Sequence, residues 1–195
     1  MTKKIEFFFD VGSPYTYLGH TQLPALVAKT GAEILWRPIL LGGIFKAIDN
    51  VSPANIQPKA AHMNTDLERH AARYGVPFLF NPHFPIFTIA LMRGAIVAQE
   101  GGFLAPYLDA VYKAIWVDAK NMNEPDVVGR VLSEAGLDAT AIFARVQEQD
   151  IKDKLKANTV EAVSRGAYGA PTFFVGADMY FGQDRLDFVA EALVA

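Results

Sequence analysis

The chain contains no cysteine. It can therefore form no disulfide and no thiolate metal site, and it can perform no thiol chemistry with a side chain of its own. A surplus of positive charge is also missing, because the formal net charge is −3. This balance argues against nucleic acid or an anionic membrane as a partner.

Long hydrophobic runs are absent as well. Glycine, proline or a charged residue interrupts each apolar segment before it reaches about 18 residues, so we expect no transmembrane helix. The opening MTKKIEFFFD holds too short an apolar stretch for the core of a signal peptide. A soluble, cytoplasmic location is the expectation that remains.

The composition is that of a folded globular protein. Of the 195 residues, 51% are hydrophobic and 20% are charged, which predicts a buried core and argues against disorder. At this length we expect one domain, with room for a large insertion. The sequence shows no internal repeat, low-complexity tract or linker.

Residues 1–38 predict a β-α-β unit. The short, nearly continuous apolar run 5–9 is typical of a central strand that is buried on both faces. A helix is expected to begin at Ser13-Pro14, because serine is a preferred N-cap and proline suits the first helical position. Gly31 should end this helix, and residues 33–38 (EILWRP) predict a second strand.

The middle of the chain predicts helices. Helical patterns cover residues 57–74, 86–99 and 103–117, a further helix starts at 123–125, and a long polar helix covers roughly 149–165. Strand patterns return at 171–175 and 180–181, which flank a turn and predict a hairpin. Asp184 is expected to cap a last helix.

Four separated segments together resemble one family. They are residues 7–18 (FFFDVGSPYTYL), 42–69, 158–172 and 181–186 (FGQDRL). In the disulfide oxidoreductases of the thioredoxin superfamily a Cys-x-x-Cys motif opens the first helix, and here that position reads Ser-Pro-Tyr-Thr, residues 13–16. The four segments resemble 2-hydroxychromene-2-carboxylate isomerases and the related kappa-class glutathione transferases, over nearly the whole chain.

The resemblance implies an α/β fold of the thioredoxin-like type with a large all-helical insertion. The thioredoxin-like part should comprise about residues 1–50 and 150–195, and the insertion about 51–149, within a single chain unit. Relatives are often dimers, and the apolar middle helices offer an interface, so the resemblance also allows a homodimer.

Ser13 taken by itself is only a helix N-terminus. The same geometry suits an anion, since a hydroxyl and N–H groups at a positive helix end would raise the thiolate fraction of a nearby thiol. The resemblance implies that Ser13 is catalytic and hydrogen-bonds the sulfur of glutathione. The cofactor would then bring the thiol that the chain lacks.

The resemblance implies further contacts to glutathione. A cis bond before Pro171 would free the Ala170 backbone to pair with the cysteinyl part, and the γ-glutamyl end would meet Asp184. The full implied set is Ser13, Asn50, Lys59, Ala170, Pro171, Gln183 and Asp184. Each residue alone also allows an ordinary interpretation. Pro171 could begin a strand and Asp184 could cap a helix. Lys59 could be a solvated lysine and Asn50 a turn residue.

The expected substrate-binding residues are Tyr15, His83, Phe84 and Phe87. The family places the loop that carries His83 near the substrate, where the imidazole could act as an acid or base. Tyr15 and Phe84, with Trp116, could form an aromatic wall, although core packing explains them equally well. Phe87 stands where the family usually carries an asparagine, which makes the pocket more apolar. The four histidines have no metal-ligand spacing, so no metal is expected.

The leading functional hypothesis is isomerisation. The family reaction interconverts 2-hydroxychromene-2-carboxylate and trans-o-hydroxybenzylidenepyruvate, a step in naphthalene-type aromatic catabolism. The substrate would be a small aromatic enone that carries a carboxylate. Reversible addition of a thiolate would turn its double bond into a single bond that can rotate. Lys46 and Arg93 are candidates to meet the carboxylate.

Two other functions remain open from the sequence. A kappa-like glutathione transferase would use the same binding residues but consume one glutathione per turnover. A non-catalytic glutathione-binding module is the alternative of another class. Thiol–disulfide exchange by the chain itself is excluded, because it requires a cysteine.

Overall fold

The structure is a computed structural model that describes residues 3–194. Its strands are β1 (Lys4–Phe9), β2 (Glu33–Pro38), β3 (Thr172–Val175) and β4 (Asp178–Phe181). The α-helices are α1 (Pro14–Thr30), α2 (Leu41–Ala47), α3 (Gln57–Tyr74), α4 (Ile89–Glu100), α5 (Leu104–Trp116), α6 (Pro125–Glu134), α7 (Ala139–Arg145), α8 (Gln149–Ser164) and α9 (Leu186–Val194). Two 3-10 turns, η1 (Pro53–Asn55) and η2 (Gln183–Arg185), complete the set.

The strands form one mixed sheet in the order β2-β1-β3-β4. Strand β1 runs parallel to β2 and antiparallel to β3, and the hairpin partner β4 is antiparallel to β3. In this register Phe7 of β1 lies opposite Trp36 of β2 on one side and Phe173 of β3 on the other. The nearly continuous apolar run of β1, interrupted only by Glu6, is explained by this central position, in which both faces are covered.

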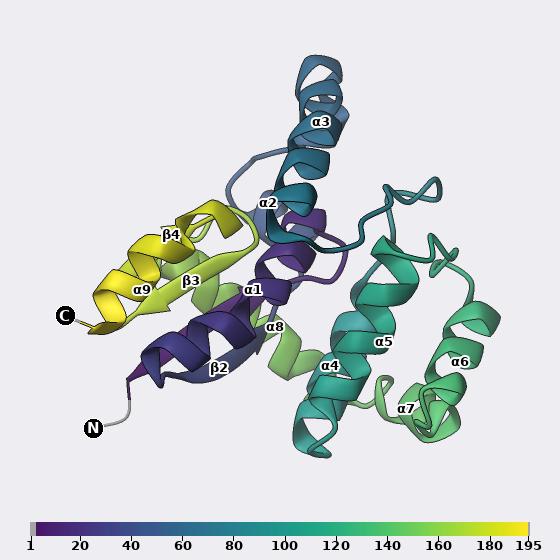
Figure 1. Cartoon of the computed structure of the whole chain (residues 1–195). Helices are drawn as coiled ribbons and strands as arrows, with labels where there is room; N and C mark the ends of the chain where they lie inside the picture. The colour runs from purple at the N-terminus through teal and green to yellow at the C-terminus, as the bar shows by residue number, and fades with distance from the viewer. Residues whose placement is uncertain (1–2, 195) are drawn as a thin grey trace.

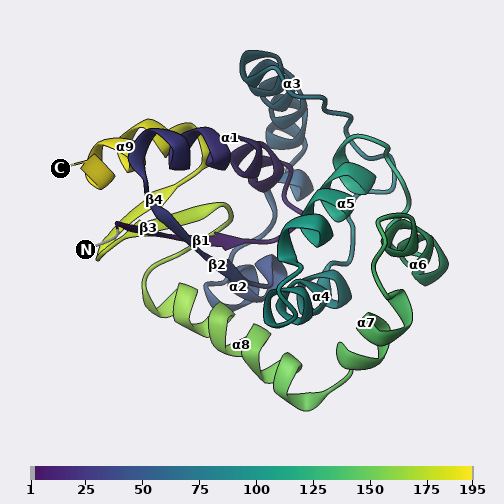
Figure 2. The ribbon, with the colours of Figure 1, turned by 60° about the horizontal axis from the view of Figure 1, so that its bottom comes forward.

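Helices cover both faces of the sheet. Figure 2 shows α1 and α9 on one side and α8 with α2 on the other, and the pairs α1–α9 and α2–α8 are in contact. Helices α4 and α5 stand beside the sheet, α6 and α7 lie outside them, and α3 projects away from the rest (Figure 1). The described ends of the chain lie close to each other.

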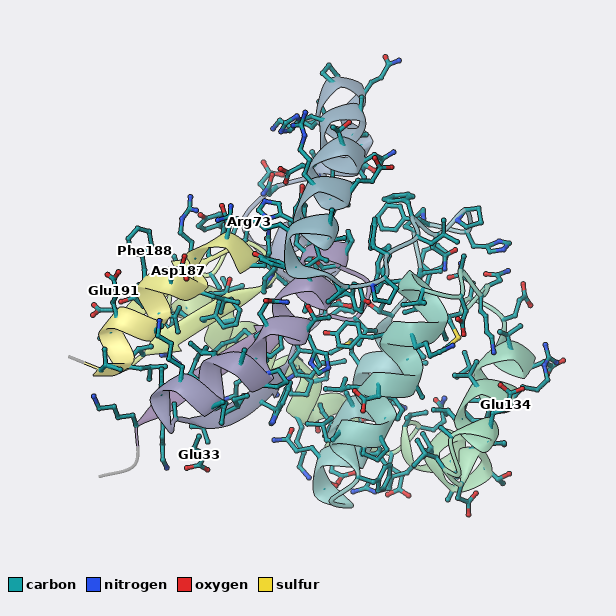
Figure 3. All side chains as sticks on the ribbon, in the orientation of Figure 1. Glu33, Arg73, Glu134, Asp187, Phe188 and Glu191 are labelled. Atoms are coloured by element: carbon teal, nitrogen blue, oxygen red, sulfur yellow. The ribbon has the colours of Figure 1, made fainter. Side chains whose placement is uncertain are left out.

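Aromatic side chains fill the two layers between the sheet and its helices. On one face Phe7 stacks on Phe9 and Phe173, with ring centroids 5.2 and 5.1 Å apart. On the other face Phe8 and Phe174 meet edge to face at 5.4 Å. All five rings are at most 1% exposed, and burying each contributes about 1.5–3 kcal/mol. Charged side chains such as Glu33, Glu134 and Glu191 instead point into solvent (Figure 3).

Most of the predicted elements are confirmed. Both predicted strands of the first unit and the hairpin near the end are present, and α3 spans the predicted residues 57–74. Ser13 caps α1 through its side chain, and Gly31 ends that helix in the left-handed region, at φ 68°. Helices α3 to α7 all fall within 51–149; the division of the chain into two parts stays a prediction.

Three details differ from the sequence predictions. The short helices α2 and α7 were not predicted. Helix α4 begins at Ile89 instead of residue 86, because the Phe87 N–H is bonded to the side chain of Asn123 and Thr88 becomes the N-cap. Asp184 is not a side-chain cap of the last helix, since it lies inside η2 and its carboxylate accepts a hydrogen bond from Arg185.

Within residues 3–194, no helix is both long enough and apolar enough to cross a membrane.

Candidate functional site

A cavity of about 710 Å³ opens at the N-terminus of α1. Six parts of the chain surround it: the turn between β1 and α1, the segment from α2 to η1, one face of α3, Phe84 in the loop before α4, the residues just before β3, and the segment from β4 through η2. Segments from both ends of the sequence therefore meet at one site.

Ser13 lies on the wall of the cavity where α1 starts. Its hydroxyl accepts a hydrogen bond from the N–H of Thr16 at 3.2 Å and donates one to the carbonyl oxygen of Ala170 at 3.0 Å. The side chain is 4% exposed, so its position is set by the protein and not by solvent. A hydroxyl held at the positive end of a helix favours a bound anion.

The residues that enter β3 form the part of the wall next to Ser13. The peptide bond between Ala170 and Pro171 is cis, as the resemblance implied. Both residues line the cavity, and the hydroxyl of Thr172 donates to the carbonyl oxygen of Gly169 at 2.8 Å, which secures the turn. The Tyr168 ring packs against Phe181 with a centroid distance of 4.3 Å and closes this side.

One face of α3 supplies polar groups to the cavity. Lys59, His62, Met63 and Asp66 all line it, with the i, i+3, i+4, i+7 spacing of a single helical face. The Tyr15 hydroxyl donates to the Asp66 carboxylate at 3.1 Å. Burial raises the pKa of Tyr15, and the charge of Asp66 raises it further, so this phenol keeps its proton at neutral pH.

Gln183 and Asp184 form the end of the cavity near η2. Gln183 is 4% exposed, and its carbonyl oxygen accepts a hydrogen bond from Tyr74 at 3.4 Å. The carboxylate of Asp184 accepts a hydrogen bond from Arg185 at 2.6 Å. A carboxylate and a guanidinium thus stand side by side, an arrangement that can meet both charges of an amino-acid end group.

The structure brings together all of the predicted glutathione contacts. The predicted residues that line the cavity are Ser13, Asn50, Lys59, Ala170, Pro171, Gln183, Asp184, Tyr15 and Phe84. Their roles toward a ligand stay predictions, because the geometry establishes only their common location. Lys59 has no ion-pair partner among residues 3–194, which leaves its ammonium group able to receive a carboxylate.

Two predicted substrate residues, His83 and Phe87, do not line the cavity. The amide of Asn123 accepts a hydrogen bond from the Phe87 N–H at 2.8 Å and donates to the carbonyl oxygens of His83 and Pro85 at 3.3 and 3.4 Å. These bonds hold the loop so that the Phe87 side chain is 76% exposed.

Three further candidates also lie outside the cavity lining. The Trp116 indole is fully buried and donates to the carbonyl oxygen of Val11 at 2.8 Å, so it belongs to the core. Lys46 is exposed on α2, and Arg93 is half-buried on α4. Neither cation is therefore placed to meet a ligand in this cavity.

Sequence reasoning missed several lining residues. His62 and Arg185 contribute polar groups, and Phe45, Tyr168 and Phe181 contribute aromatic surface. His62 could have been found from the helical spacing that joins it to Lys59. Within residues 3–194, no group of three or more histidine, aspartate or glutamate side chains could hold a metal ion.

Comparison with known proteins relates the whole chain to one family. The model of the DSBA-like thioredoxin domain matches residues 4–194. The 2-hydroxychromene-2-carboxylate isomerase of Sphingobium xenophagum is 34% identical over 199 residues, which cover all of this chain and all of the relative. Glutathione S-transferase kappa 1 of Rattus norvegicus is 28% identical and covers 97% of this chain and 90% of its own.

A solved structure shows the same architecture. This chain superposes on a 2-hydroxychromene-2-carboxylate isomerase with a TM-score of 0.87 at 26% identity, over 98% of this chain and 94% of that chain.

Proposed function

The chain belongs to the DSBA-like thioredoxin domain family and is related over its full length to 2-hydroxychromene-2-carboxylate isomerases, and from this premise we propose that it is a glutathione-dependent isomerase. The proposed reaction interconverts 2-hydroxychromene-2-carboxylate and trans-o-hydroxybenzylidenepyruvate. The proposal includes a cytoplasmic location and a place in aromatic-compound catabolism.

One observation carries the proposal. A buried serine hydroxyl stands at a helix N-terminus beside a cis-proline turn, at one end of a large cavity, in a chain without cysteine. This is the position at which redox members of the superfamily carry their reactive thiol. The site therefore retains the features that stabilise a thiolate while the thiol must come with a ligand.

The donor set of the cavity fits glutathione. The ligand has a thiol, two carboxylates and an ammonium group. Ser13 and the start of α1 suit the sulfur, and the Asp184 carboxylate suits the ammonium. The ammonium of Lys59, which has no ion-pair partner within residues 3–194, suits a carboxylate. The side chain of Asn50 already accepts a hydrogen bond from the N–H of Val51 at 2.8 Å, which leaves its amide N–H groups for a ligand.

When bound, glutathione supplies a thiolate whose reversible addition to an enone turns the double bond into a single bond that can rotate. The Ser13 hydroxyl would then turn from Ala170 toward the sulfur and stabilise the anion by hydrogen bonding. Helix α1 adds its positive end at the same point. Both effects raise the thiolate fraction at neutral pH.

The remaining cavity wall suits a flat aromatic substrate. Leu41, Phe45, Met63 and Phe84 provide apolar surface next to Ser13. His62 lies one helical turn from Lys59 and is the other basic side chain of α3 in the cavity. Because Lys59 is assigned to a carboxylate of glutathione, we assign the substrate carboxylate to His62, in place of Lys46 and Arg93.

A direct test is a spectrophotometric assay with trans-o-hydroxybenzylidenepyruvate, with and without glutathione. The proposal predicts turnover only when glutathione is present, and strongly reduced turnover for Ser13→Ala. Equal rates with and without glutathione would contradict the cofactor assignment. No turnover under any condition would contradict the substrate assignment.

A kappa-like glutathione transferase is the second candidate, favoured by the relative from Rattus norvegicus at 28% identity. It would use the same sulfur site, so residue substitutions in the glutathione contacts do not separate the two functions. The fate of the thiol does, because a transferase consumes one glutathione in each turnover and an isomerase consumes none.

A further inference from the structure

Asp10 is a buried carboxylate that the proposed chemistry does not use. It lies in the turn between β1 and α1 and is 1% exposed. Burial raises the pKa of this carboxyl, while hydrogen bonds from three neighbours oppose the rise. Burying a carboxylate costs free energy, because the group loses its water, and hydrogen bonds within the protein must offset that cost.

Three different segments donate hydrogen bonds to this one carboxylate. Its Oδ1 accepts from the N–H of Gly12 at 3.0 Å. Its Oδ2 accepts from the N–H of Leu41 at 2.8 Å and from the hydroxyl of Thr88 at 3.0 Å. In addition, the Asp10 carbonyl oxygen accepts from the N–H of Ser13 at 3.0 Å. The residue thus fixes the backbone of Ser13 and also ties it to two distant segments.

Each donor stands at the beginning of a helix. Gly12 comes just before Ser13, the N-cap of α1. Leu41 is the first residue of α2, and Thr88 is the N-cap of α4. Neither α2 nor α4 has a side-chain cap of its own. The carboxylate of Asp10 satisfies the first backbone N–H of α2, which that helix leaves open, and holds α4 through the hydroxyl of its N-cap residue Thr88. Three positive helix ends converge on one negative group.

The junction leaves almost no space. A Cβ atom added at Gly12 would lie 2.7 Å from the Cγ2 atom of Thr88 and 3.4 Å from the Oδ1 atom of Asp10. Only glycine allows the α1 turn and the start of α4 to approach this closely. A shift at any of these groups therefore displaces the others.

The same groups form the Ser13 end of the cavity. Gly12, Ser13 and Leu41 line it directly, and the loop that ends at Thr88 carries Phe84, which lines it as well. The glutathione contacts Lys59 and Asp184 lie on α3 and η2 and make no hydrogen bond to Asp10. The carboxylate is thus linked to the sulfur end of the site and not to the ends that would hold the tripeptide.

We propose that Asp10 is a positioning residue: its buried carboxylate holds the N-termini of α1, α2 and α4 together, so that the Ser13 hydroxyl meets the glutathione sulfur in the geometry that stabilises a thiolate. This inference rests on the proposed glutathione site. It predicts that loss of the carboxylate damages thiolate stabilisation much more than glutathione affinity.

The test is a titration of the thiol of bound glutathione in wild type and in Asp10→Asn, followed through the ultraviolet absorbance of the thiolate. An asparagine amide, in either orientation, places an NH₂ group against a backbone N–H that the carboxylate accepts, so the junction must shift. The proposal predicts that the pKa of the bound thiol rises by about one unit, a roughly tenfold loss of thiolate. Removal of a negative charge alone would instead lower that pKa.

The two explanations predict shifts of the thiol pKa in opposite directions, so the titration separates them. A fall or no change in the thiol pKa of bound glutathione, with Asp10→Asn still folded, overturns the proposal. A lower melting temperature with an unchanged thiol pKa identifies a merely structural role and also overturns it. Where turnover is measured, kcat should fall roughly 10- to 100-fold, as expected for a small misplacement, while KM for glutathione changes far less.

A matched pair at Thr88 covers the case in which Asp10→Asn does not fold. Thr88→Val keeps the side-chain shape but removes the hydroxyl donor, and Thr88→Ser keeps the donor. The proposal predicts a raised thiol pKa for Thr88→Val and a nearly normal one for Thr88→Ser; equal values for the two variants contradict it. If wild type binds no glutathione, the proposed function fails first, a result distinct from normal binding with an unshifted thiol in the variants.

Discussion

The hydroxyl of Ser13 donates a hydrogen bond to the carbonyl oxygen of Ala170 at 3.0 Å, across 157 positions of sequence. This bond joins the start of α1 to the residue before the cis proline. It keeps the hydroxyl oriented in the absence of a ligand, and a thiolate that binds between the two segments would compete with the carbonyl for the same proton.

Ser13→Ala should reduce kcat by about 100- to 1000-fold, the usual effect of removing one hydrogen-bond donor to a developing anion. Steady-state kinetics with saturating glutathione measures this loss. The substitution also removes the cap of α1 and should cost about 1 kcal/mol of stability.

Asp138→Ala is the matched control for cap loss. Asp138 caps α7 by accepting a hydrogen bond from the N–H of Ala141 at 2.9 Å, and it does not line the cavity. A similar loss of stability with normal activity is expected for this variant. If Asp138→Ala lost activity as Ser13→Ala does, the effect of Ser13 would be structural.

Lys59→Met should weaken glutathione binding about three- to tenfold, because a hydrogen bond to a charged group is lost at an exposed position where solvent screens it. Isothermal titration of glutathione measures the change, and the difference from wild type should shrink at high salt. Lys156→Met is the control, since Lys156 is an exposed lysine of α8 outside the cavity. Equal affinities for the two variants would remove Lys59 from the glutathione site.

Glu6 should stabilise the fold at neutral pH and lose this effect in acid. Partial burial raises its pKa, but hydrogen bonds and charge from Arg165 and Arg37 outweigh burial and lower the pKa below the ordinary 4.5. The contribution is therefore complete above pH 4.5 and is lost as the pH falls through the lowered pKa of Glu6.

Urea unfolding of Glu6→Gln tests this expectation. The free energy of unfolding at neutral pH should fall by about 1–3 kcal/mol, and the difference from wild type should vanish in strong acid. The control is Glu33→Gln, because the contact from Glu33 to Lys4 is long, at 3.8 Å, and the Glu33 side chain is 51% exposed. A pH-independent loss for Glu6→Gln would contradict the ion-pair explanation.

Gly94→Ala should destabilise the protein by about 1–3 kcal/mol through overpacking. A Cβ at Gly94 would overlap the hydroxyl of Tyr107, which is buried and donates to the carbonyl oxygen of Leu91 at 2.7 Å. At Gly129, in the interior of α6, a Cβ would make only ordinary contact with Phe143 at 3.4 Å.

Gly129→Ala should therefore be neutral or stabilising by up to about 1 kcal/mol, from helix propensity alone. Thermal unfolding of the two variants measures the contrast. Equal melting temperatures would show that the contact between α4 and α5 yields easily.

The sequence predicts the elements that depend on local signals. The apolar run of β1, the Ser-Pro start of α1 and the length of α3 are all readable from residue type and period. Helices α2 and α7 have seven residues each, too few for a periodic pattern to be clear. Part of what holds α2 at its start is the carboxylate of Asp10, a contact between separated segments that no local pattern contains.

The residues that line the cavity were predictable where the resemblance supplied them. They were less predictable where a hydrogen bond from a distant segment sets the position of a loop. Ser13, Lys59 and Asp184 meet in one cavity as expected. His83 and Phe87 do not, because Asn123, which follows them by 40 and 36 positions, holds their loop. Such a bond between separated loops has no signature in a single sequence.

The central claim is that glutathione acts without being consumed. We would measure the conversion of trans-o-hydroxybenzylidenepyruvate and the free thiol concentration together, in one sample that contains glutathione at a small fraction of the substrate. The account predicts many turnovers per glutathione with the thiol concentration unchanged. Loss of one thiol for each substrate converted, or conversion that stops when substrate equal to the glutathione has reacted, would contradict it and favour the transferase.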